Sequence, residues 1–198
     1  MNARRISFRF AIDADGVLFN FDASWRICAE RMLRRDLPVV QPVYDLSSRY
    51  ALSRAEMAKV WAAWNTAECW RTVQPISSAI NVTRMLIDMG HSVTVVTKLP
   101  SEKAAEERRW CLDHHGLFEA DLVTVKDSKK SALAKLRPHF YADDLLFHCL
   151  EAKDVFVPHI VKIESCGFGE VPDGIEKHKE LETAIREFFQ TAKRQLVS

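Results

Sequence analysis

The sequence has no clear excess of charge of either sign, because 28 lysines and arginines stand against 27 acidic residues. A net charge of +1 argues against a protein that holds duplex nucleic acid on a broad basic surface. No run approaches the roughly eighteen uninterrupted apolar residues of a transmembrane helix. The basic residues 1–5 are followed at once by a strand-like run that ends in acids, so no secretory signal peptide is expected. These absences favour a cytoplasmic protein without a membrane partner.

Metal-binding and disulfide patterns are also lacking. The five cysteines are scattered without a Cys-x-x-Cys pair, which argues against a disulfide framework and a zinc knuckle. The seven histidines show neither His-x-His nor His-Glu-x-x-His spacing, so transition-metal ligation is not expected. No internal repeat or low-complexity segment is present. What remains, with 47% hydrophobic and 28% charged residues, is the composition of a globular domain.

The chain alternates short hydrophobic runs with helical patterns. The expected strands cover residues 6–12, 91–97, 122–125, 140–142 and 160–163. The expected core helices open near residue 77 and stop at Gly90, and then cover 101–115, 129–136, 144–152 and 177–195. Strands rich in β-branched residues, without polar alternation, predict an α/β fold in which helices cover both faces of a Rossmann-like parallel sheet.

A surplus segment follows the first strand. Asp13 and Thr97 lie much further apart than the roughly thirty residues of one βαβ crossover, which leaves roughly fifty residues over. One helical pattern begins at Asp22, and a second begins after Ser53, which has an acid three residues later as in a capping box. Residues 19–74 are therefore expected to form a small helical cap, and residues 1–18 and 75–198 the core.

Polar side chains follow the expected strands at the edge where ligands bind in parallel sheets. They are Asp13 and Asp15 after the first strand, Thr97 after the second, Lys129 and Lys130 at the helix after the third, and Asp143 and Asp144 after the fourth. Converging carboxylates bind hard cations such as Mg²⁺ through oxygen. A hydroxyl and an ammonium group can hold a phosphate and neutralise its developing charge. The set suits phosphoryl transfer.

These residues resemble the motifs of the haloacid dehalogenase superfamily of phosphatases. The first motif is Ile12-Asp13-Ala14-Asp15-Gly16-Val17-Leu18, the second Val95-Val96-Thr97, the third Lys129 or Lys130, and the fourth Tyr141-Ala142-Asp143-Asp144. The resemblance extends from residue 6 to about residue 150, and the surplus segment lies where that superfamily inserts a helical cap.

The resemblance implies a mechanism for each acidic residue. Asp13 would be the nucleophile that forms an aspartyl-phosphate, and Asp15 would protonate the leaving oxygen and later activate water. Mg²⁺ would be bound by Asp13, the backbone carbonyl of Asp15, and either Asp143 or Asp144. Alternatively, the fourth motif is only a helix cap and the first only an Asp-Gly turn.

The lysine of the third motif has three candidates. Lys129 is preferred because it lies in line with the buried stripe of its helix, whereas Lys130 lies one position off that line. Lys126 is the alternative if a loop supplies the lysine, and either helical lysine could instead be a solvated side chain. His148, four residues past Asp144, could also reach the same edge.

Within the superfamily, the sequence is similar to 5′(3′)-deoxyribonucleotidases and to bacterial and phage relatives. The implied partner is a small phosphorylated metabolite, with a nucleoside monophosphate as the leading candidate, and a homodimer is left open. The candidate substrate-binding side chains are Phe19, Phe21, Trp25, Tyr44, Trp64 and Lys98. The tryptophans are interpreted first as the core of the cap itself. The alternatives are a phosphatase for a sugar phosphate or another small phosphoester, and a catalytically idle binding or regulatory module.

Overall fold

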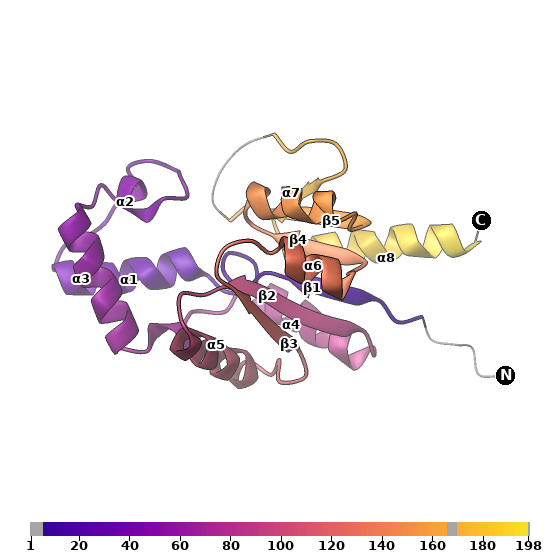
Figure 1. Ribbon diagram of the computed structural model, residues 1–198, viewed down its shortest axis with the longest axis horizontal. Helices are drawn as coiled ribbons and strands as arrows, with labels where there is room; N and C mark the ends of the chain where they lie inside the picture. Colours follow the sequence, from indigo (N-terminus) through magenta and orange to yellow (C-terminus); the bar gives the residue numbers. More distant parts are fainter. Residues whose placement is uncertain (1–5, 166–169, 198) are drawn as a thin grey trace.

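The computed structural model describes residues 6–165 and 170–197. Six parallel strands form one sheet in the order β3-β2-β1-β4-β5-β6 (Figure 1). The strands are β1 (Arg9–Ile12), β2 (Ser92–Lys98), β3 (Asp121–Val125), β4 (Phe140–Asp143), β5 (His159–Ile163) and β6 (Glu176–His178). The α/β fold expected from the sequence is confirmed.

Helices cover both faces of the sheet. One face packs against α4 (Ser77–Asp88), α5 (Glu102–His114) and α8 (Leu181–Val197), and the other packs against α6 (Lys130–Leu136) and α7 (Leu146–Asp154). Phe10 and Ile12 belong to the first core, whereas Ala11 between them belongs to the second. This period of two is that of a strand buried on both sides, which explains why β1 lacks polar alternation.

The register of the sheet brings the ends of its central strands to one edge. Ile12 pairs with Val95 of β2 and with Ala142 of β4. The backbone N–H of Asp13 then donates to the carbonyl oxygen of Ala142 at 2.9 Å. The residues that follow β1 and β4 therefore lie next to each other.

Residues 19–74, which we call the helical segment, connect β1 to α4. They contain α1 (Phe21–Leu33), α2 (Leu46–Arg49), α3 (Arg54–Thr66) and the 3₁₀ turn η1 (Cys69–Arg71). Helices α1, α2 and α3 lie to the left of the sheet in Figure 1. Helix α1 packs on α3, while η1 packs on α5 of the core. The capping box expected at Ser53 is confirmed, since its hydroxyl accepts from the Glu56 N–H and the Glu56 carboxylate accepts from the Ser53 N–H.

Two expected boundaries are wrong. The last helix does not begin near residue 177, because β6 occupies Glu176–His178 and α8 starts at Leu181. The sequence does not indicate this strand because Glu-Lys-His contains no apolar side chain, as an edge strand paired only with β5 permits. The first strand is also shorter than expected, since pairing begins at Arg9.

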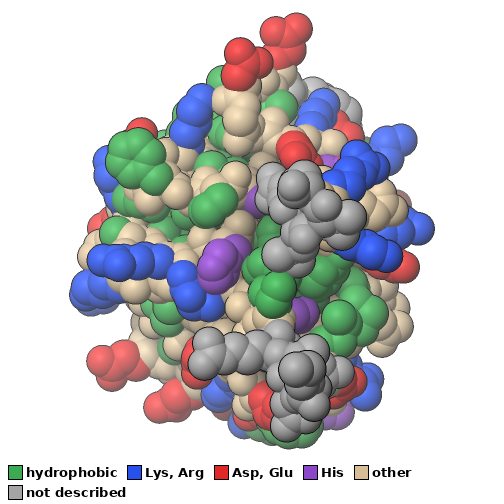
Figure 2. Space-filling view, turned by 90° about the vertical axis from the view of Figure 1, so that its right-hand side faces the viewer, with side chains coloured by type: hydrophobic (Ala, Val, Ile, Leu, Met, Phe, Trp, Pro, Cys, Tyr) green, Lys and Arg blue, Asp and Glu red, His purple; other side chains and the backbone are tan. Residues whose placement is uncertain are grey.

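One face of the molecule carries charges of both signs. Figure 2, which views the face that is on the right in Figure 1, shows basic and acidic side chains interspersed. Among the described helices, none has the length and apolar composition that crossing a bilayer requires. Cys28, Cys69, Cys111 and Cys149 are free thiols, and Cys166 lies outside the described residues.

Candidate active site

The loop after β1 is a tight turn that glycine makes possible. The N–H groups of Leu18 and Phe19 both donate to the carbonyl oxygen of Ala14 at 2.9 Å, which folds the chain back on itself. Gly16 has a φ of +79°, and a Cβ there would overlap the carboxylate of Asp144. Any other residue at position 16 would be strained at this φ and would displace the Asp144 carboxylate.

Three carboxylates meet at this edge of the sheet. Oxygens of Asp13, Asp143 and Asp144, which we call the acidic cluster, lie within 4.8 Å of one another. All three residues are buried. Lys129 Nζ lies 2.8 Å from Asp13 Oδ1 and 2.7 Å from Asp143 Oδ2, and the lysine is only 1% exposed. The first, third and fourth motifs are therefore in direct contact.

The electrostatics of the acidic cluster follow from burial and from close like charges. Burial and the nearby carboxylates raise the pKa of Asp13 despite the opposing effect of Lys129. Burial and the charge of Asp143 raise the pKa of Asp144 to about 7. For Lys129, burial would lower the pKa, but Asp13 and Asp143 outweigh it and raise the pKa above its ordinary value.

A divalent cation fits this arrangement. When ionised, three buried carboxylates and one ammonium group sum to two negative charges, and the ligand atoms that the carboxylates offer are all oxygens, as Mg²⁺ prefers. Asp143 is engaged on both oxygens, because Oδ2 contacts Lys129 and the Tyr141 hydroxyl while Oδ1 accepts from Leu145 N–H at 2.8 Å. Asp13 and Asp144 line the cavity described below, whereas Asp143 does not, so these two carboxylates are better placed to reach a metal, although Asp144 Oδ2 also accepts from the Ser165 hydroxyl at 2.6 Å.

Residues of α7 hold Lys129 in place. The carboxylate of Glu151 accepts from the Lys129 backbone N–H at 3.0 Å and contacts His148 Nδ1 at 2.7 Å. Burial would raise the pKa of Glu151, but hydrogen bonds from Ser128 and His148 lower it. His148 is buried and also lines the cavity described below.

Asp15 has a partner that the sequence does not reveal. Arg108 of α5, fully buried, places Nη2 2.6 Å from Asp15 Oδ1. Its guanidinium carbon lies 4.9 Å from the ring centroid of Phe19 and 5.6 Å from that of Trp70. Burial raises the pKa of Asp15, and the ion pair with Arg108 limits that rise. The one available signal is an arginine on the buried stripe of α5, four residues after Ala104.

The remaining candidates of the second and third motifs differ in whether they line the cavity. Thr97 is buried in β2, and its neighbour Lys98 is exposed, but both line the cavity, as does Lys126. Lys130 does not line it, and its Nζ instead lies 2.8 Å from the exposed Asp154. Of the two helical lysines, the structure brings Lys129 into the acidic cluster and leaves Lys130 outside, because successive residues of a helix point in different directions.

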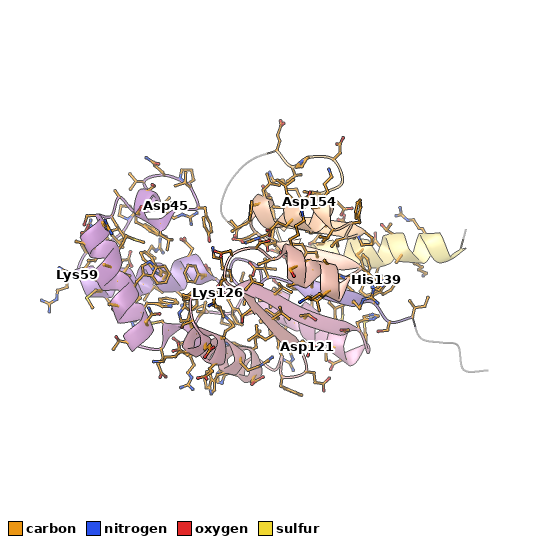
Figure 3. The ribbon with its side chains drawn as sticks, in the orientation of Figure 1. Asp45, Lys59, Asp121, Lys126, His139 and Asp154 are labelled. Atoms are coloured by element: carbon orange, nitrogen blue, oxygen red, sulfur yellow. The ribbon has the colours of Figure 1, made fainter. Side chains whose placement is uncertain are left out.

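A cavity of about 780 Å³ lies between the sheet edge and the helical segment. Figure 3 shows Asp45 on the helical segment and Lys126 beside the sheet, and both residues line this cavity. One side holds the carboxylates of Asp13, Asp15 and Asp144. The other side includes three rings, Phe21, Trp61 and Trp70, which we call the aromatic wall. Their planes lie within 22° of parallel, with centroids 5.6 to 6.2 Å apart.

The substrate-binding candidates divide between the cavity and the core. Phe21 and Tyr44 line the cavity. Phe19, Trp25 and Trp64 do not, and each is at most 1% exposed, because they fill the core where the helical segment packs. Those three expectations are not met.

Sequence reasoning misses several lining residues of the helical segment. Trp61 and Trp70 face the cavity, as does Arg49. Arg49 donates from Nε to the carbonyl oxygen of Val43 at 2.7 Å, and its Nη1 lies 2.8 Å from Asp22 Oδ1. Tryptophans that face the cavity and tryptophans that fill the core recur at the same helical spacing. The sequence therefore does not distinguish the two kinds.

Comparisons with known proteins bear on the fold. No protein-family model matches the sequence, and a comparison with curated proteins finds no match. A haloacid dehalogenase-like family hydrolase from Xanthomonas campestris superposes with a TM-score of 0.62 at 12% identity, over 96% of this chain and 99% of that chain. A HAD-hydrolase from Bacillus subtilis bound to magnesium gives 0.62 at 12% identity, over 93% of this chain and 100% of that chain.

A third solved structure is that of a D,D-heptose 1,7-bisphosphate phosphatase from Burkholderia thailandensis. It superposes with a TM-score of 0.55 at 12% identity, over 92% of this chain and 99% of that chain. The chain therefore has the fold of haloacid dehalogenase-like hydrolases, as its four motifs indicated. At such low identity the likeness establishes the fold alone.

Proposed function

We propose that this protein is a Mg²⁺-dependent phosphomonoester hydrolase that works through an aspartyl-phosphate. The observation that carries the proposal is the buried acidic cluster, in which Lys129 bridges Asp13 and Asp143 at the base of the cavity. A buried group of like charges is costly to fold and is typical of a catalytic site.

Asp13 is the nucleophile. Its Oδ1 accepts from the Ala14 N–H at 2.7 Å and lies 2.8 Å from Lys129 Nζ, which fixes the carboxylate. Oδ2 attacks the phosphorus atom, and the bond to the ester oxygen breaks as the new P–O bond forms. Lys129 and the hydroxyl of Thr97 stabilise charge on the phosphoryl oxygens.

Asp15 moves the protons. Its protonated carboxyl donates to the departing ester oxygen, and the resulting carboxylate then accepts a proton from the water that hydrolyses the aspartyl-phosphate. Arg108 stabilises the ionised form that this second step needs.

Asp13, Asp144 and the backbone carbonyl of Asp15 would hold the Mg²⁺. The bound cation supplies positive charge that offsets the repulsion between the Asp13 carboxylate and an anionic substrate. Asp143 orients Lys129 instead, since both of its oxygens are already engaged.

The helical segment acts as a cap over the core formed by residues 1–18 and 75–198. Its aromatic wall faces the acidic cluster across the cavity, and closure over a bound substrate would keep bulk water from the aspartyl-phosphate.

The substrate class proposed first is a nucleoside monophosphate. Three nearly parallel rings on the cavity side offer a surface on which a base can pack. A sugar phosphate is the second candidate, because Asn20, Asp22 and Asn65 also line the cavity and could bond hydroxyl groups.

A screen of purified protein against p-nitrophenyl phosphate, nucleoside monophosphates and sugar phosphates tests the proposal. Phosphate release with Mg²⁺ that is lost with EDTA is expected, and the preferred substrate decides between the two classes. No release from any compound, with Mg²⁺ bound by the protein, would contradict the hydrolase and favour an idle binding module.

A further inference from the structure

One buried histidine of the cavity has no part in the reaction described above. His148 is only 4% exposed, and it lines the cavity, as Asp144 and Lys129 do. It lies in the first turn of α7, the helix that follows the fourth motif. A polar side chain that is buried by the protein and still reaches a cavity is placed to contact what the cavity binds.

Glu151 fixes one nitrogen of the His148 ring. Its Oε2 lies 2.7 Å from His148 Nδ1 and also accepts from the Lys129 backbone N–H at 3.0 Å. An ionised carboxylate can only accept hydrogen bonds, so Nδ1 carries the hydrogen of this contact. One oxygen atom therefore anchors both the imidazole and the lysine that reaches the acidic cluster.

The other ring nitrogen is open to the cavity. Nε2 of His148 forms no hydrogen bond with any described residue, and it is not one of the polar atoms that are both buried and unpartnered. It is therefore accessible from outside the protein. Because the side chain is almost completely buried and lines the cavity, Nε2 is accessible from the cavity.

The surroundings of this nitrogen favour an anion. A carboxylate at one ring nitrogen stabilises an imidazole that carries a proton on the other nitrogen as well, and such a ring donates from both. Lys126 and Lys129 line the same cavity. A donor on a positively charged ring forms short, strong hydrogen bonds with phosphate oxygens.

We propose that His148 is a substrate-binding residue whose Nε2–H donates to an oxygen of the phosphoryl group. The inference rests on the proposed hydrolase function, which supplies the identity of the ligand. Lys129 and His148 would then contact the phosphoryl group together, and Glu151 would keep both in position.

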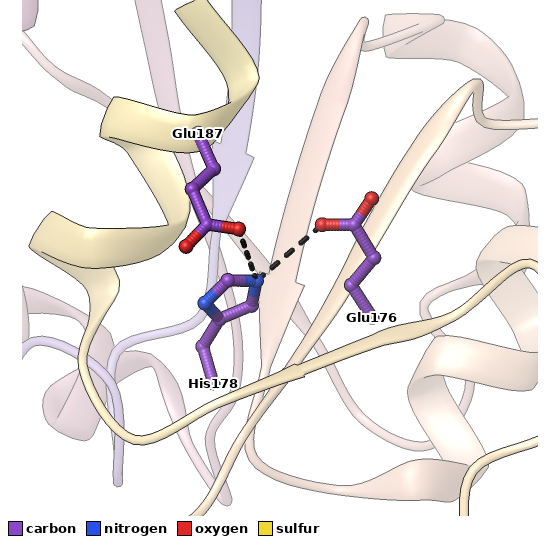
Figure 4. A group of neighbouring side chains, drawn as sticks. All are labelled: Glu176, His178 and Glu187. Carbon is purple, nitrogen blue, oxygen red and sulfur yellow. Dashed lines mark hydrogen bonds and ion pairs between the residues drawn. The ribbon is translucent and has the colours of Figure 1, made fainter. Parts of the chain in front are cut away.

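A second histidine bound to carboxylates provides a matched control. Nε2 of His178 lies 3.4 Å from Glu176 Oε2 and 3.9 Å from Glu187 Oε2, as Figure 4 shows. Both of these carboxylates are half exposed, and none of the three residues lines the cavity. A change at His178 therefore alters the same kind of contact at a distance from the substrate.

Inorganic phosphate, the product of the proposed reaction, tests the binding role without turnover. Calorimetric titration of the full-length protein in excess Mg²⁺ is expected to show one equivalent bound. Absence of phosphate binding would overturn the inference. Phosphate binding by a protein that hydrolyses no phosphoester would contradict the proposed hydrolase and leave the role of His148 in binding intact.

Two substitutions separate binding of phosphate from support of Glu151. His148→Asn keeps an N–H near the position of Nδ1 and removes Nε2, whereas His148→Gln keeps an N–H near the position of Nε2. His148→Asn is expected to weaken phosphate binding by about ten- to hundredfold, the range of a hydrogen bond to a charged group. His148→Gln should weaken it by only about threefold because a neutral donor remains, and His178→Asn should leave it unchanged. Wild-type affinity in folded His148→Asn would overturn the inference.

A measurement on the wild-type protein covers the case in which His148→Asn does not fold. His148 is the one histidine among the described residues that lines the cavity. In protein labelled with ¹⁵N at histidine, saturation with phosphate in excess Mg²⁺ is expected to shift one Nε2 signal strongly. Histidine signals that all stay in place while phosphate binds would contradict the contact with His148.

Discussion

The acidic cluster and the aromatic wall face each other across one cavity, but different kinds of structure position them. The carboxylates stand at the ends of adjacent parallel strands, whose register places Asp13 beside Ala142 through a backbone hydrogen bond of 2.9 Å. The rings of the wall come from α1, α3 and η1, and their direction depends on how those helices rotate and pack.

This difference in how the two sides are positioned separates the residues for the chemical step from the residues for substrate selectivity. A cluster fixed by the sheet would act on the phosphoryl group of any substrate, whereas a wall carried by the helical segment would act only on the part of the substrate that reaches it. Changes on the two sides should therefore affect different kinetic parameters, and four substitutions test this from the largest expected effect to the smallest.

Asp13→Asn is expected to lower kcat by several orders of magnitude for every substrate, because an amide cannot form the aspartyl-phosphate. The fold should persist, since Lys129 keeps its contact with Asp143 and a buried repulsion is removed. Steady-state kinetics and circular dichroism measure the two effects. Asp127→Asn, an exposed acid of the loop that follows β3, is the matched control and should keep full activity. Turnover by the Asp13 variant at the wild-type rate would refute the mechanism.

Asp15→Asn is expected to lower kcat by about 10² to 10⁴, the range that a general acid and base contributes. The loss should be smaller for p-nitrophenyl phosphate than for an alkyl phosphate, because nitrophenolate leaves without a proton. Stopped-flow measurement of nitrophenolate release distinguishes formation of the aspartyl-phosphate from its later hydrolysis. An equal loss on both substrates in the single-turnover rate of ester-bond cleavage, which precedes hydrolysis of the aspartyl-phosphate, would show that Asp15 does not protonate the leaving group.

The sequence predicts the residues fixed by the sheet better than those that depend on how helices pack. Hydrophobic runs mark where the strands end, so the sequence alone places Asp13, Thr97 and Asp144 at one edge of the sheet. The contact between Arg108 and Asp15 cannot be predicted in this way, because it joins residues 93 positions apart and depends on the packing of α5.

The helical segment is predictable as helices but not as a surface. Trp61 faces the cavity while Trp64, three residues later on α3, is buried. Periodicity places both on the apolar side of the helix and cannot tell which part of that side meets a neighbouring helix and which meets a cavity. The charged strand β6 escapes prediction for a related reason, since an edge strand needs no hydrophobic pattern.

Arg108→Met is expected to lower kcat by about tenfold, because Asp15 remains but loses the partner that orients it and favours its ionised form. Arg108 lowers the pKa of Asp15. Its removal should therefore raise that pKa and move the acidic limb of the kcat–pH profile to higher pH. Arg109→Met, a neighbour paired instead with Asp113, is the control. A lower kcat with an unmoved acidic limb would indicate only a packing role for Arg108.

Trp61→Ala should have the smallest effect and the most selective one. Loss of a ring from the aromatic wall is expected to raise KM for the preferred nucleoside monophosphate by about five- to tenfold, at the lower end of what base stacking contributes. The values of kcat, and of KM for ribose 5-phosphate, should stay near wild type because the acidic cluster is untouched. Steady-state kinetics on both substrates measure this, with Trp110→Ala, an exposed tryptophan of α5, as the control. Equal increases in KM on both substrates would mean that the aromatic wall shapes the cavity as a whole. The helical segment would then not select between substrates, and the proposed division between chemistry and selectivity would be wrong.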